Sequence, residues 1–229
     1  MRRGTDTGES RLGGYGLGRK FFNLTGALLL LAATMQPARA DSQPLRLLLL
    51  GDSLTAGYGL PPDDGFVAQM DRALADAGVE AAVLDAGVSG DTTAGGRARV
   101  AWALADKPTH AVVALGANDA LRGLPADAAK EDLHAIRDAV AEAGVRVLLA
   151  GMQAARNWGQ DYADAFDAIY PAVAEEAGVL LYPFFLEGVA LDPALNQADG
   201  IHPNAEGVAV MVENLTPWVL ELLALEPGA

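Results

Sequence analysis

The segment LLLLGDSLTAGYG, residues 47–59, joins a strongly apolar run to a polar, glycine-rich loop. Gly51 follows the four leucines, and Ser53 lies just beyond the carboxyl end of the apolar run. A run that is apolar throughout is typical of a parallel strand buried on both faces of a sheet. A serine that follows such a strand is either the cap of the next helix or a nucleophile, and the segment by itself allows both.

Strand-like and helix-like patterns alternate along the rest of the chain. Apolar runs at residues 45–50, 81–84, 111–115, 145–150 and 179–182 predict five strands. Helical patterns lie between them at residues 66–77, 93–105, 127–143 and 162–177. A last helix is expected after Asn204, with a break near Pro217. This alternation predicts an α/β fold, a three-layer α/β/α sandwich with a doubly wound, mostly parallel sheet of about five strands.

The first 40 residues have the pattern of a secretory signal peptide that follows an N-terminal extension. Arg19 and Lys20 precede an apolar run at residues 21–35, and Ala38-Arg39-Ala40 supplies the small residues of a cleavage site. The run is shorter than the roughly 20 residues that a membrane span needs. We therefore expect cleavage after Ala40, a periplasmic or secreted protein without a stable membrane anchor, and a single domain over residues 41–229.

The charge of the chain excludes some classes of partner. It has 16 basic and 30 acidic residues, and six of the basic and two of the acidic ones lie within the first 40. The remainder thus carries 10 basic and 28 acidic residues, a net charge of −18. Such a surface repels phosphate backbones, which argues against a nucleic-acid partner. Because the chain has no cysteine, it also lacks a disulfide framework and a thiolate zinc site.

Residues that can take part in catalysis lie in the loops that follow the predicted strands. In an open α/β sheet the functional site forms beyond the carboxyl ends of the strands. Those loops cover residues 51–59, 86–96, 116–125, 151–159 and 183–200. They supply a serine, glycine turns with free backbone N–H groups, a side-chain amide and an acid–histidine pair. Hydrolysis of an ester or thioester by a serine needs this set, namely a nucleophile, a base, a group that orients the base and donors for the oxyanion.

The base can be chosen by elimination, because the chain has three histidines. His110 opens the third strand at the amino edge of the sheet, and His134 lies within a helix, where we expect it to be solvated. His202 alone lies in a carboxyl-edge loop near an acid. Asp199 precedes it by three residues, so both side chains can lie on one side of a turn. Asp199 would then accept a hydrogen bond from Nδ1, leaving Nε2 to take the proton of Ser53.

Other kinds of site that have similar sequence motifs fit this sequence less well. An Asp-x-x-His pair is half of a metal site, but no second histidine or cysteine occupies an edge loop. The segment after the first strand lacks the Gly-Lys-Ser/Thr ending of a phosphate loop, and no G-x-G-x-x-G follows a strand. The lipase-type G-x-S-x-G elbow is also absent, since the second glycine near Ser89 comes one place early.

Four blocks in order resemble the SGNH (GDSL) hydrolase family, and within it the bacterial acyl-CoA thioesterase I/lysophospholipase L1/arylesterase branch. They are GDSL at residues 51–54, VSGDT at 88–92, GAND at 116–119 and DGIHP at 199–203. The resemblance covers roughly residues 45–225. One departure is Ala117, where this branch often has a second glycine. Alanine needs an ordinary backbone conformation there, and the way in which this loop approaches the site depends on it.

The resemblance implies a flavodoxin-like SGNH hydrolase fold, a single catalytic domain and a monomeric serine esterase. Such an enzyme hydrolyses carboxylic esters and thioesters through an acyl-serine intermediate and needs no cofactor. Aryl esters, acyl thioesters and lysophospholipids are the substrates that the branch suggests. The residues implied are Ser53 as nucleophile, His202 as base and Asp199 as its orienting acid. An oxyanion hole is implied from the backbone N–H groups of Ser53 and Gly90 and the side-chain amide of Asn118.

Apolar residues of the edge loops are candidates for an acyl-binding groove, namely Leu121, Leu124, Trp158 and Phe184. Phe184 and Phe185 are adjacent near a strand end and point opposite ways, so one of them should belong to the core. The loops at residues 120–125 and 153–159 are candidates for movement on binding. Two alternatives to the esterase stay open. One is a carbohydrate O-acetyl esterase with the same triad, and the other is a non-catalytic periplasmic binding module.

Overall fold

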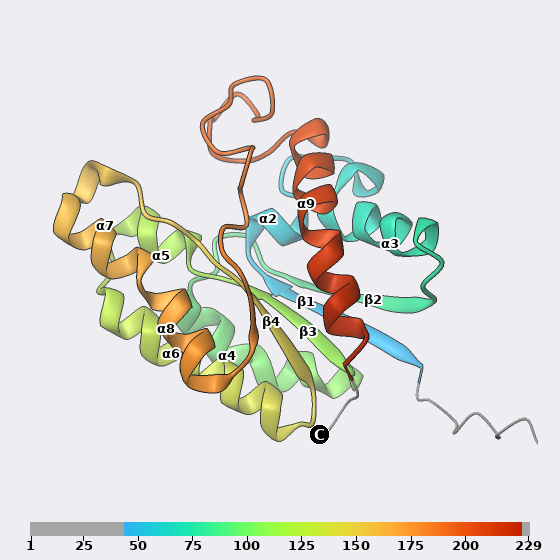
Figure 1. Cartoon of the computed structure of the whole chain (residues 1–229). Helices are drawn as coiled ribbons and strands as arrows, with labels where there is room; N and C mark the ends of the chain where they lie inside the picture. The colour runs from blue at the N-terminus through green and yellow to red at the C-terminus, as the bar shows by residue number, and fades with distance from the viewer. Residues whose placement is uncertain (1–43, 226–229) are drawn as a thin grey trace, which may run out of the picture. The chain divides into compact units, whose positions relative to one another are not determined.

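A parallel five-stranded sheet lies at the centre of the computed structural model, which describes residues 44–225 (Figure 1). The spatial order of the strands is β2-β1-β3-β4-β5, and every neighbouring pair is parallel. The strands are β1 (Leu45–Gly51), β2 (Ala81–Gly87), β3 (His110–Ala114), β4 (Arg146–Ala150) and β5 (Leu180–Tyr182). All five predicted strands are thereby confirmed. The expected signal sequence and its cleavage site at Ala40 lie outside the described residues.

Helices cover both faces of this sheet. They are α2 (Ser53–Ala56), α3 (Phe66–Asp76), α4 (Thr93–Ala103), α5 (Ala117–Arg122), α6 (Ala126–Glu142), α7 (Gln160–Asp167), α8 (Ile169–Ala177) and α9 (Ala205–Leu223). Three short 3-10 helices complete the set: η1 (Pro62–Asp64), η2 (Leu104–Asp106) and η3 (Arg156–Trp158). On one face α3 packs against α9, and on the other α4, α6 and α8 lie side by side (Figure 1). The predicted three-layer α/β/α sandwich is therefore confirmed.

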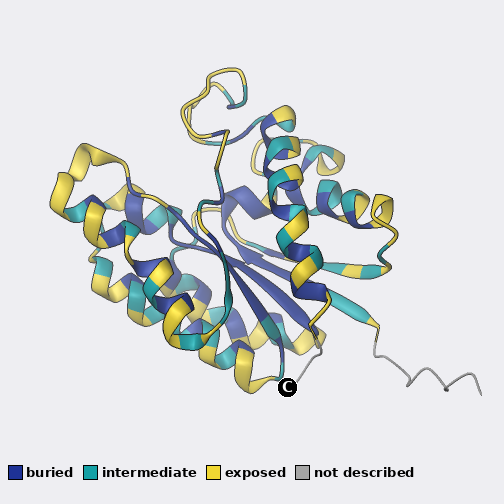
Figure 2. Cartoon of the chain, in the orientation of Figure 1, coloured by how far each residue is buried: buried dark blue, intermediate teal, exposed yellow. Residues whose placement is uncertain are grey.

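The central strands form the core, because both of their faces are covered by helices. The four consecutive leucines at residues 47–50 of β1 and every residue of β3 are buried, as the dark strands in Figure 2 show. Burying one such leucine side chain contributes about 1.5–3 kcal/mol. The edge strand β2 is longer than its apolar run, since pairing with β1 continues past the exposed Asp85 as far as Gly87.

The single helix expected at residues 162–177 is wrong, because two helices occupy this segment. Helix α7 ends at Asp167 and α8 begins at Ile169, with Ala168 between them. Pro171 has no backbone N–H to donate to the carbonyl of Asp167, so the helical hydrogen-bond ladder cannot run through this point. In the first turn of α8 the missing N–H is harmless.

The break expected near Pro217 is also wrong, since α9 runs through this residue to Leu223. Apolar residues along the whole helix are buried, including Val212 and Leu215 before the proline and Val219 after it. This packing holds the helix together although Pro217 removes one backbone hydrogen bond. Within residues 44–225, no helix combines the length with the apolar character that crossing a bilayer requires.

Candidate active site

The carboxyl ends of the first three strands align, which brings their loops together. Gly51 at the end of β1 pairs with Gly87 of β2 on one side and with Ala114 of β3 on the other. The segments that follow these strand ends carry Ser53 at the start of α2, Gly90 in a loop and Asn118 in α5. The sequence thus places the three residues on one edge of the sheet because their strands end in register.

Ser53, His202 and Asp199 form a hydrogen-bonded chain. The Ser53 Oγ atom lies 3.0 Å from Nε2 of His202, and Nδ1 of the same ring lies 2.7 Å from Oδ2 of Asp199. With the ring proton on Nδ1, the imidazole donates to the carboxylate and presents an unprotonated Nε2 to the serine hydroxyl. This is the arrangement in which a histidine can take a proton from a serine.

The turn that holds Asp199 keeps its side chain ionised. The Oδ1 atom accepts hydrogen bonds from the backbone N–H groups of Ile201 and His202, at 2.9 and 3.0 Å. These two bonds, with the His202 one the stronger influence, and the ring of His202 hold the pKa of Asp199 well below its ordinary value. Gly200 permits the turn with a φ of 70°. The carboxylate is therefore fixed in position and negatively charged across the neutral pH range.

Tyr58 is a part of this site that the sequence did not suggest. Its ring lies against that of His202, with ring centroids 4.5 Å apart and planes tilted by 38°. The loop that carries His202 is held by its own contacts, since Gln197 donates its backbone N–H to the carbonyl of His202 and its side-chain amide to the carbonyl of Tyr58. The sequence does not predict the contact between Tyr58 and Gln197, because the two residues are far apart in the chain and belong to no recognisable motif.

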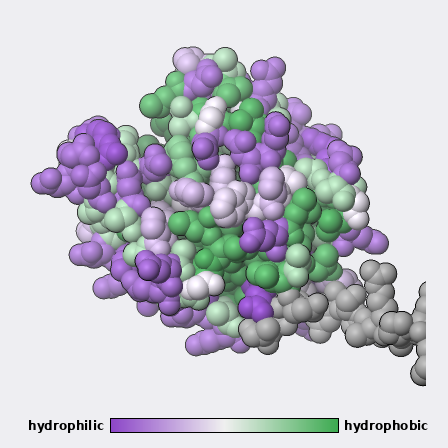
Figure 3. Space-filling view, in the orientation of Figure 1, coloured by the Kyte–Doolittle hydropathy of each residue, from purple (hydrophilic) through white to green (hydrophobic). Residues whose placement is uncertain are grey.

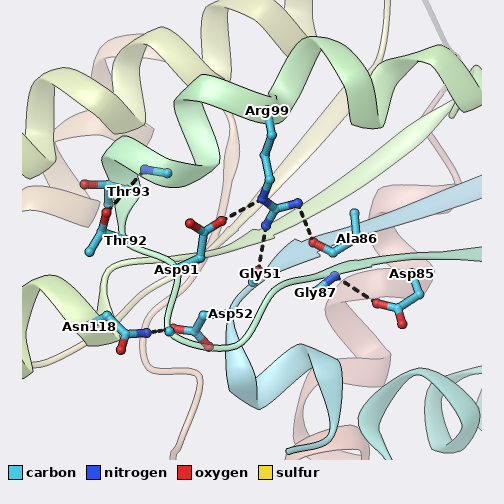
Figure 4. A network of polar contacts seen from close by, with 12 residues as sticks. Gly51, Asp52, Asp85, Ala86, Gly87, Asp91, Thr92, Thr93, Arg99 and Asn118 are labelled. Carbon is cyan, nitrogen blue, oxygen red and sulfur yellow. Dashed lines mark hydrogen bonds and ion pairs between the residues drawn. The ribbon is translucent and has the colours of Figure 1, made fainter.

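Asn118 faces the serine loop from α5. Its Nδ2 atom donates to Oδ2 of Asp52 at 3.2 Å (Figure 4). The Oδ1 atom of Asp52 accepts from the N–H of Leu54. An amide nitrogen has two hydrogens, so this bond leaves one for another acceptor. Burial raises the pKa of Asp52 to about 6, although the hydrogen bonds from Leu54 and Asn118 oppose the rise.

The two glycine positions of the site differ in conformation. Gly90 has a φ of 82° and is exposed, so its backbone can approach a ligand closely. Gly116 has a φ of 118°, and Ala117 follows as the first residue of α5 outside the left-handed region. Gly116 takes the unusual conformation, so an alanine at position 117 is accommodated without strain.

The other two histidines lie elsewhere, as expected for His110 at the amino end of β3. His110 is fully buried, and its Nε2 lies 2.9 Å from the carbonyl oxygen of Leu225. His134 was expected to be solvated, but its side chain is only 24% exposed and lies 3.3 Å from a carboxylate oxygen of Glu176. Within residues 44–225, no group of three or more histidine, cysteine or acidic side chains is placed to hold a metal ion.

The predicted groove residues lie in α5, in η3 and in the loops that follow α5 and β5. Leu121 and Trp158 are about half exposed, at 49% and 50%, and the Trp158 ring packs over Gly123. Leu124 and Phe184 are partly buried, and Phe185 is the member of its pair that belongs to the core. A hollow of about 510 Å³ lies elsewhere, lined by residues of α2, η1, α3 and β2, and none of the four candidates lines it.

Comparisons with known proteins agree with this geometry. Residues 49–210 match the model of the GDSL-like lipase/acylhydrolase family. Esterase TesA of Pseudomonas aeruginosa is 40% identical over 201 residues, covering 87% of this chain and 98% of TesA. The thioesterase 1/protease 1/lysophospholipase L1 of Escherichia coli is 38% identical, covering 78% and 83%.

A solved structure extends the agreement to the fold. AlinE4, an SGNH-hydrolase family esterase, is 42% identical with a TM-score of 0.67, and the match covers 80% of this chain and 99% of AlinE4. The segment that matches the family model, residues 49–210, includes both the GDSL loop and the loop that carries the acid–histidine pair. The chain belongs to the GDSL-like lipase/acylhydrolase family, whose members are also called SGNH hydrolases.

Proposed function

We propose that this protein is a serine esterase that hydrolyses carboxylic esters and thioesters, with Ser53 as nucleophile, His202 as base and Asp199 as orienting acid. The observation that carries the proposal is the chain of contacts from Asp199 through His202 to Ser53, at 2.7 and 3.0 Å. Membership of the family and the names of the relatives, an esterase and a thioesterase/lysophospholipase, support the same activity.

In the first half of the reaction, the Ser53 Oγ atom adds to the carbonyl carbon while its proton passes to Nε2 of His202. The negative charge moves to the carbonyl oxygen, which accepts hydrogen bonds from the N–H groups of Ser53 and Gly90 and from Nδ2 of Asn118. Ser53 begins α2, so its N–H has no partner within the helix and is free for this role. The intermediate then collapses, and His202 protonates the departing alcohol or thiol.

In the second half, water attacks the acyl-serine and gives one proton to His202. The second tetrahedral intermediate uses the same donors and collapses with return of the proton to Ser53, which releases the carboxylic acid. The negative charge of Asp199 stabilises the imidazolium that forms in each half. These steps use side chains and backbone groups of this chain and one water molecule.

Export is part of the proposal. The basic, apolar and small-residue pattern of residues 19–40 supports a signal peptide cleaved after Ala40, followed by one catalytic domain over residues 41–229 that works as a monomer. The enzyme would then act on small ester or thioester substrates in the periplasm or outside the cell.

The proposal is tested by turnover of p-nitrophenyl acyl esters. We expect Ser53→Ala and His202→Ala each to lower kcat by about 10⁴-fold or more while leaving the thermal melting curve close to that of the wild type. Near-normal turnover by either variant would contradict the proposed roles of Ser53 and His202. A profile from acetyl to palmitoyl esters tests the prediction that Leu121 and Trp158 bind the acyl chain, and a sharp preference for acetyl would favour the carbohydrate O-acetyl esterase instead.

A further inference from the structure

One arginine outside the catalytic residues binds three acceptors at the edge of the sheet (Figure 4). From α4, Arg99 donates Nε to Oδ2 of Asp91 at 2.6 Å, Nη1 to the carbonyl of Ala86 and Nη2 to the carbonyl of Gly51, both at 2.8 Å. Both members of the ion pair are largely buried, with 18% and 14% of their side chains exposed. Arg99 thereby connects the ends of β1 and β2 with the loop that follows β2.

These acceptors bracket the parts that hold the oxyanion in the proposed mechanism. Ala86 and Asp91 flank residues 87–90, and Asp91 directly follows Gly90. Gly51 lies two residues before Ser53, and its carbonyl also accepts the N–H of Val88 at 3.1 Å. The Arg99 guanidinium therefore bonds to residues on both sides of the Gly90 loop and to the strand that leads to Ser53, while Arg122 donates to the carbonyl of Gly90 itself at 2.8 Å.

The backbone of α4 is shaped to leave room for this contact. A Cβ atom added at Gly95 would lie 1.8 Å from Oδ1 of Asp91, so the carboxylate rests directly against a glycine of the helix. A guanidinium offers its donors in a rigid fork, so all three bonds form only when their acceptors keep fixed relative positions. Lysine, with a single charged nitrogen, cannot reproduce this geometry.

We propose that Arg99 is a positioning residue for the oxyanion hole, holding the N–H of Gly90 at the correct distance from Ser53. The inference rests on the proposed function. It does not require that Arg99 contact the substrate. Misplacement of a catalytic group by about 1 Å can cost on the order of 100-fold in rate, which is the scale on which loss of the fork should act.

The test compares Arg99→Gln with Arg99→Lys and a matched control, Arg97→Gln. Arg97 lies on the same helix, but its side chain, 55% exposed, forms an ion pair with Asp132 of α6. For a p-nitrophenyl butyrate substrate, we expect Arg99→Gln to lower kcat about 10- to 100-fold with KM within about twofold. We expect Arg99→Lys to fall between Arg99→Gln and the wild type, and Arg97→Gln to stay within about twofold of the wild type.

A second readout separates positioning from loosening of the fold. A trifluoromethyl ketone adds to Ser53 and forms a hemiketal whose anionic oxygen occupies the oxyanion position. Its inhibition constant should rise in Arg99→Gln by about the factor by which kcat/KM falls. All rates are expressed per active site, counted by complete labelling with a fluorophosphonate, so that unfolded protein does not enter the comparison.

Unchanged kcat per labelled site in Arg99→Gln, an unchanged inhibition constant, or an equal loss in Arg97→Gln would overturn the inference. If Arg99→Gln does not fold, Asp91→Asn decides, because it removes the carboxylate charge and keeps both carbonyl contacts. We expect it to lower kcat several-fold at constant KM, and wild-type turnover would contradict the inference. Ser53→Ala, measured alongside, distinguishes the two proposals. If it is active the proposed function is wrong, and if it is inactive while Arg99→Gln turns over normally only the role of Arg99 is wrong.

Discussion

Asp52 combines complete burial with a position between Ser53 and Asn118. Burial raises its pKa from 3.8 to about 6, which corresponds to a cost on the order of 3 kcal/mol for keeping the carboxylate ionised in the folded protein at neutral pH. In return the ionised carboxylate accepts the N–H of Leu54 at the start of α2 and one hydrogen of the Asn118 amide. This orients the remaining hydrogen of Asn118, so Asp52 supports the site at the expense of stability.

The free energy of unfolding should therefore depend on pH through Asp52. Because its pKa is raised in the folded state, the folded protein binds more protons than the unfolded chain between about pH 4 and pH 6, and stability from this group falls as pH rises through that window. Asp52→Asn removes the titration. Relative to the wild type, we expect the variant to gain about 2–3 kcal/mol between pH 4 and pH 7, measured by urea unfolding.

A matched control is Asp85→Asn on the edge strand β2. Asp85 also accepts a backbone N–H, that of Gly87 at 2.8 Å, but its side chain is exposed. This variant, measured over the same pH range, shows what removing an acidic side chain does where that side chain is not buried. A pH-independent difference between Asp52→Asn and the wild type would contradict the role of burial in shifting the pKa of Asp52.

At the scale of single elements, α9 continues through a proline because its apolar residues are packed against the rest of the protein. Pro217 is exposed and has no N–H for the carbonyl of Glu213, which is itself exposed, yet the helix continues to Leu223. The Thr216 hydroxyl donates to the carbonyl of Val212 at 2.6 Å and adds support on the preceding turn. The N-terminus of α9 is capped by Asn204, whose side chain accepts from the N–H of Gly207.

Pro217→Ala should stabilise the protein. The substitution restores one helical hydrogen bond and relieves the contact between the proline ring and the preceding turn, while it gives the unfolded chain more freedom. We expect a net gain of about 1–2 kcal/mol in the free energy of unfolding by urea titration, with unchanged esterase turnover. Pro62→Ala is the control, since Pro62 opens η1, where a proline is compatible with the backbone. A loss of stability in Pro217→Ala would show that the contacts of the proline ring contribute more to stability than the restored hydrogen bond.

Helices and strands differ in how far the sequence predicts them. The strands follow from continuous apolar runs, which arise because the parallel sheet is covered on both faces. The split between α7 and α8 depends on Pro171 falling where its missing N–H interrupts the ladder, a detail that apolar periodicity does not express. The site shows the same contrast, because loop position and residue type suggest Ser53 and His202. Arg99 bonds to backbone carbonyls on two strands, and such contacts leave no spacing pattern in the sequence.

For the whole molecule, the excess of acidic residues sets the field in which substrates approach. Residues 41–229 carry a net charge of −18, and hydrophilic side chains cover much of the face drawn in Figure 3. Association with an anionic substrate is opposed by this charge, whereas association with a neutral ester is not. Salt shortens the range of the field, since the Debye length falls to about 10 Å at 0.1 M.

The KM for butyryl-CoA, an anionic thioester, should therefore fall several-fold when the salt concentration rises from about 20 to about 200 mM. The KM for the neutral p-nitrophenyl butyrate should change little over the same range and serves as the control. A KM for butyryl-CoA that rises with salt would mean that positive groups close to the site, such as Arg122, which donates to the carbonyl of Gly90, dominate over the net charge.

The central claim is that Ser53 is a nucleophile activated by His202 and Asp199. It is tested most directly by reaction with a fluorophosphonate, followed by mass spectrometry of the digested protein. The account predicts one adduct per chain, located on Ser53, with no labelling of Ser53→Ala and labelling slowed by orders of magnitude in His202→Ala. An unlabelled wild-type protein, or an adduct on another residue that persists in Ser53→Ala, would contradict it.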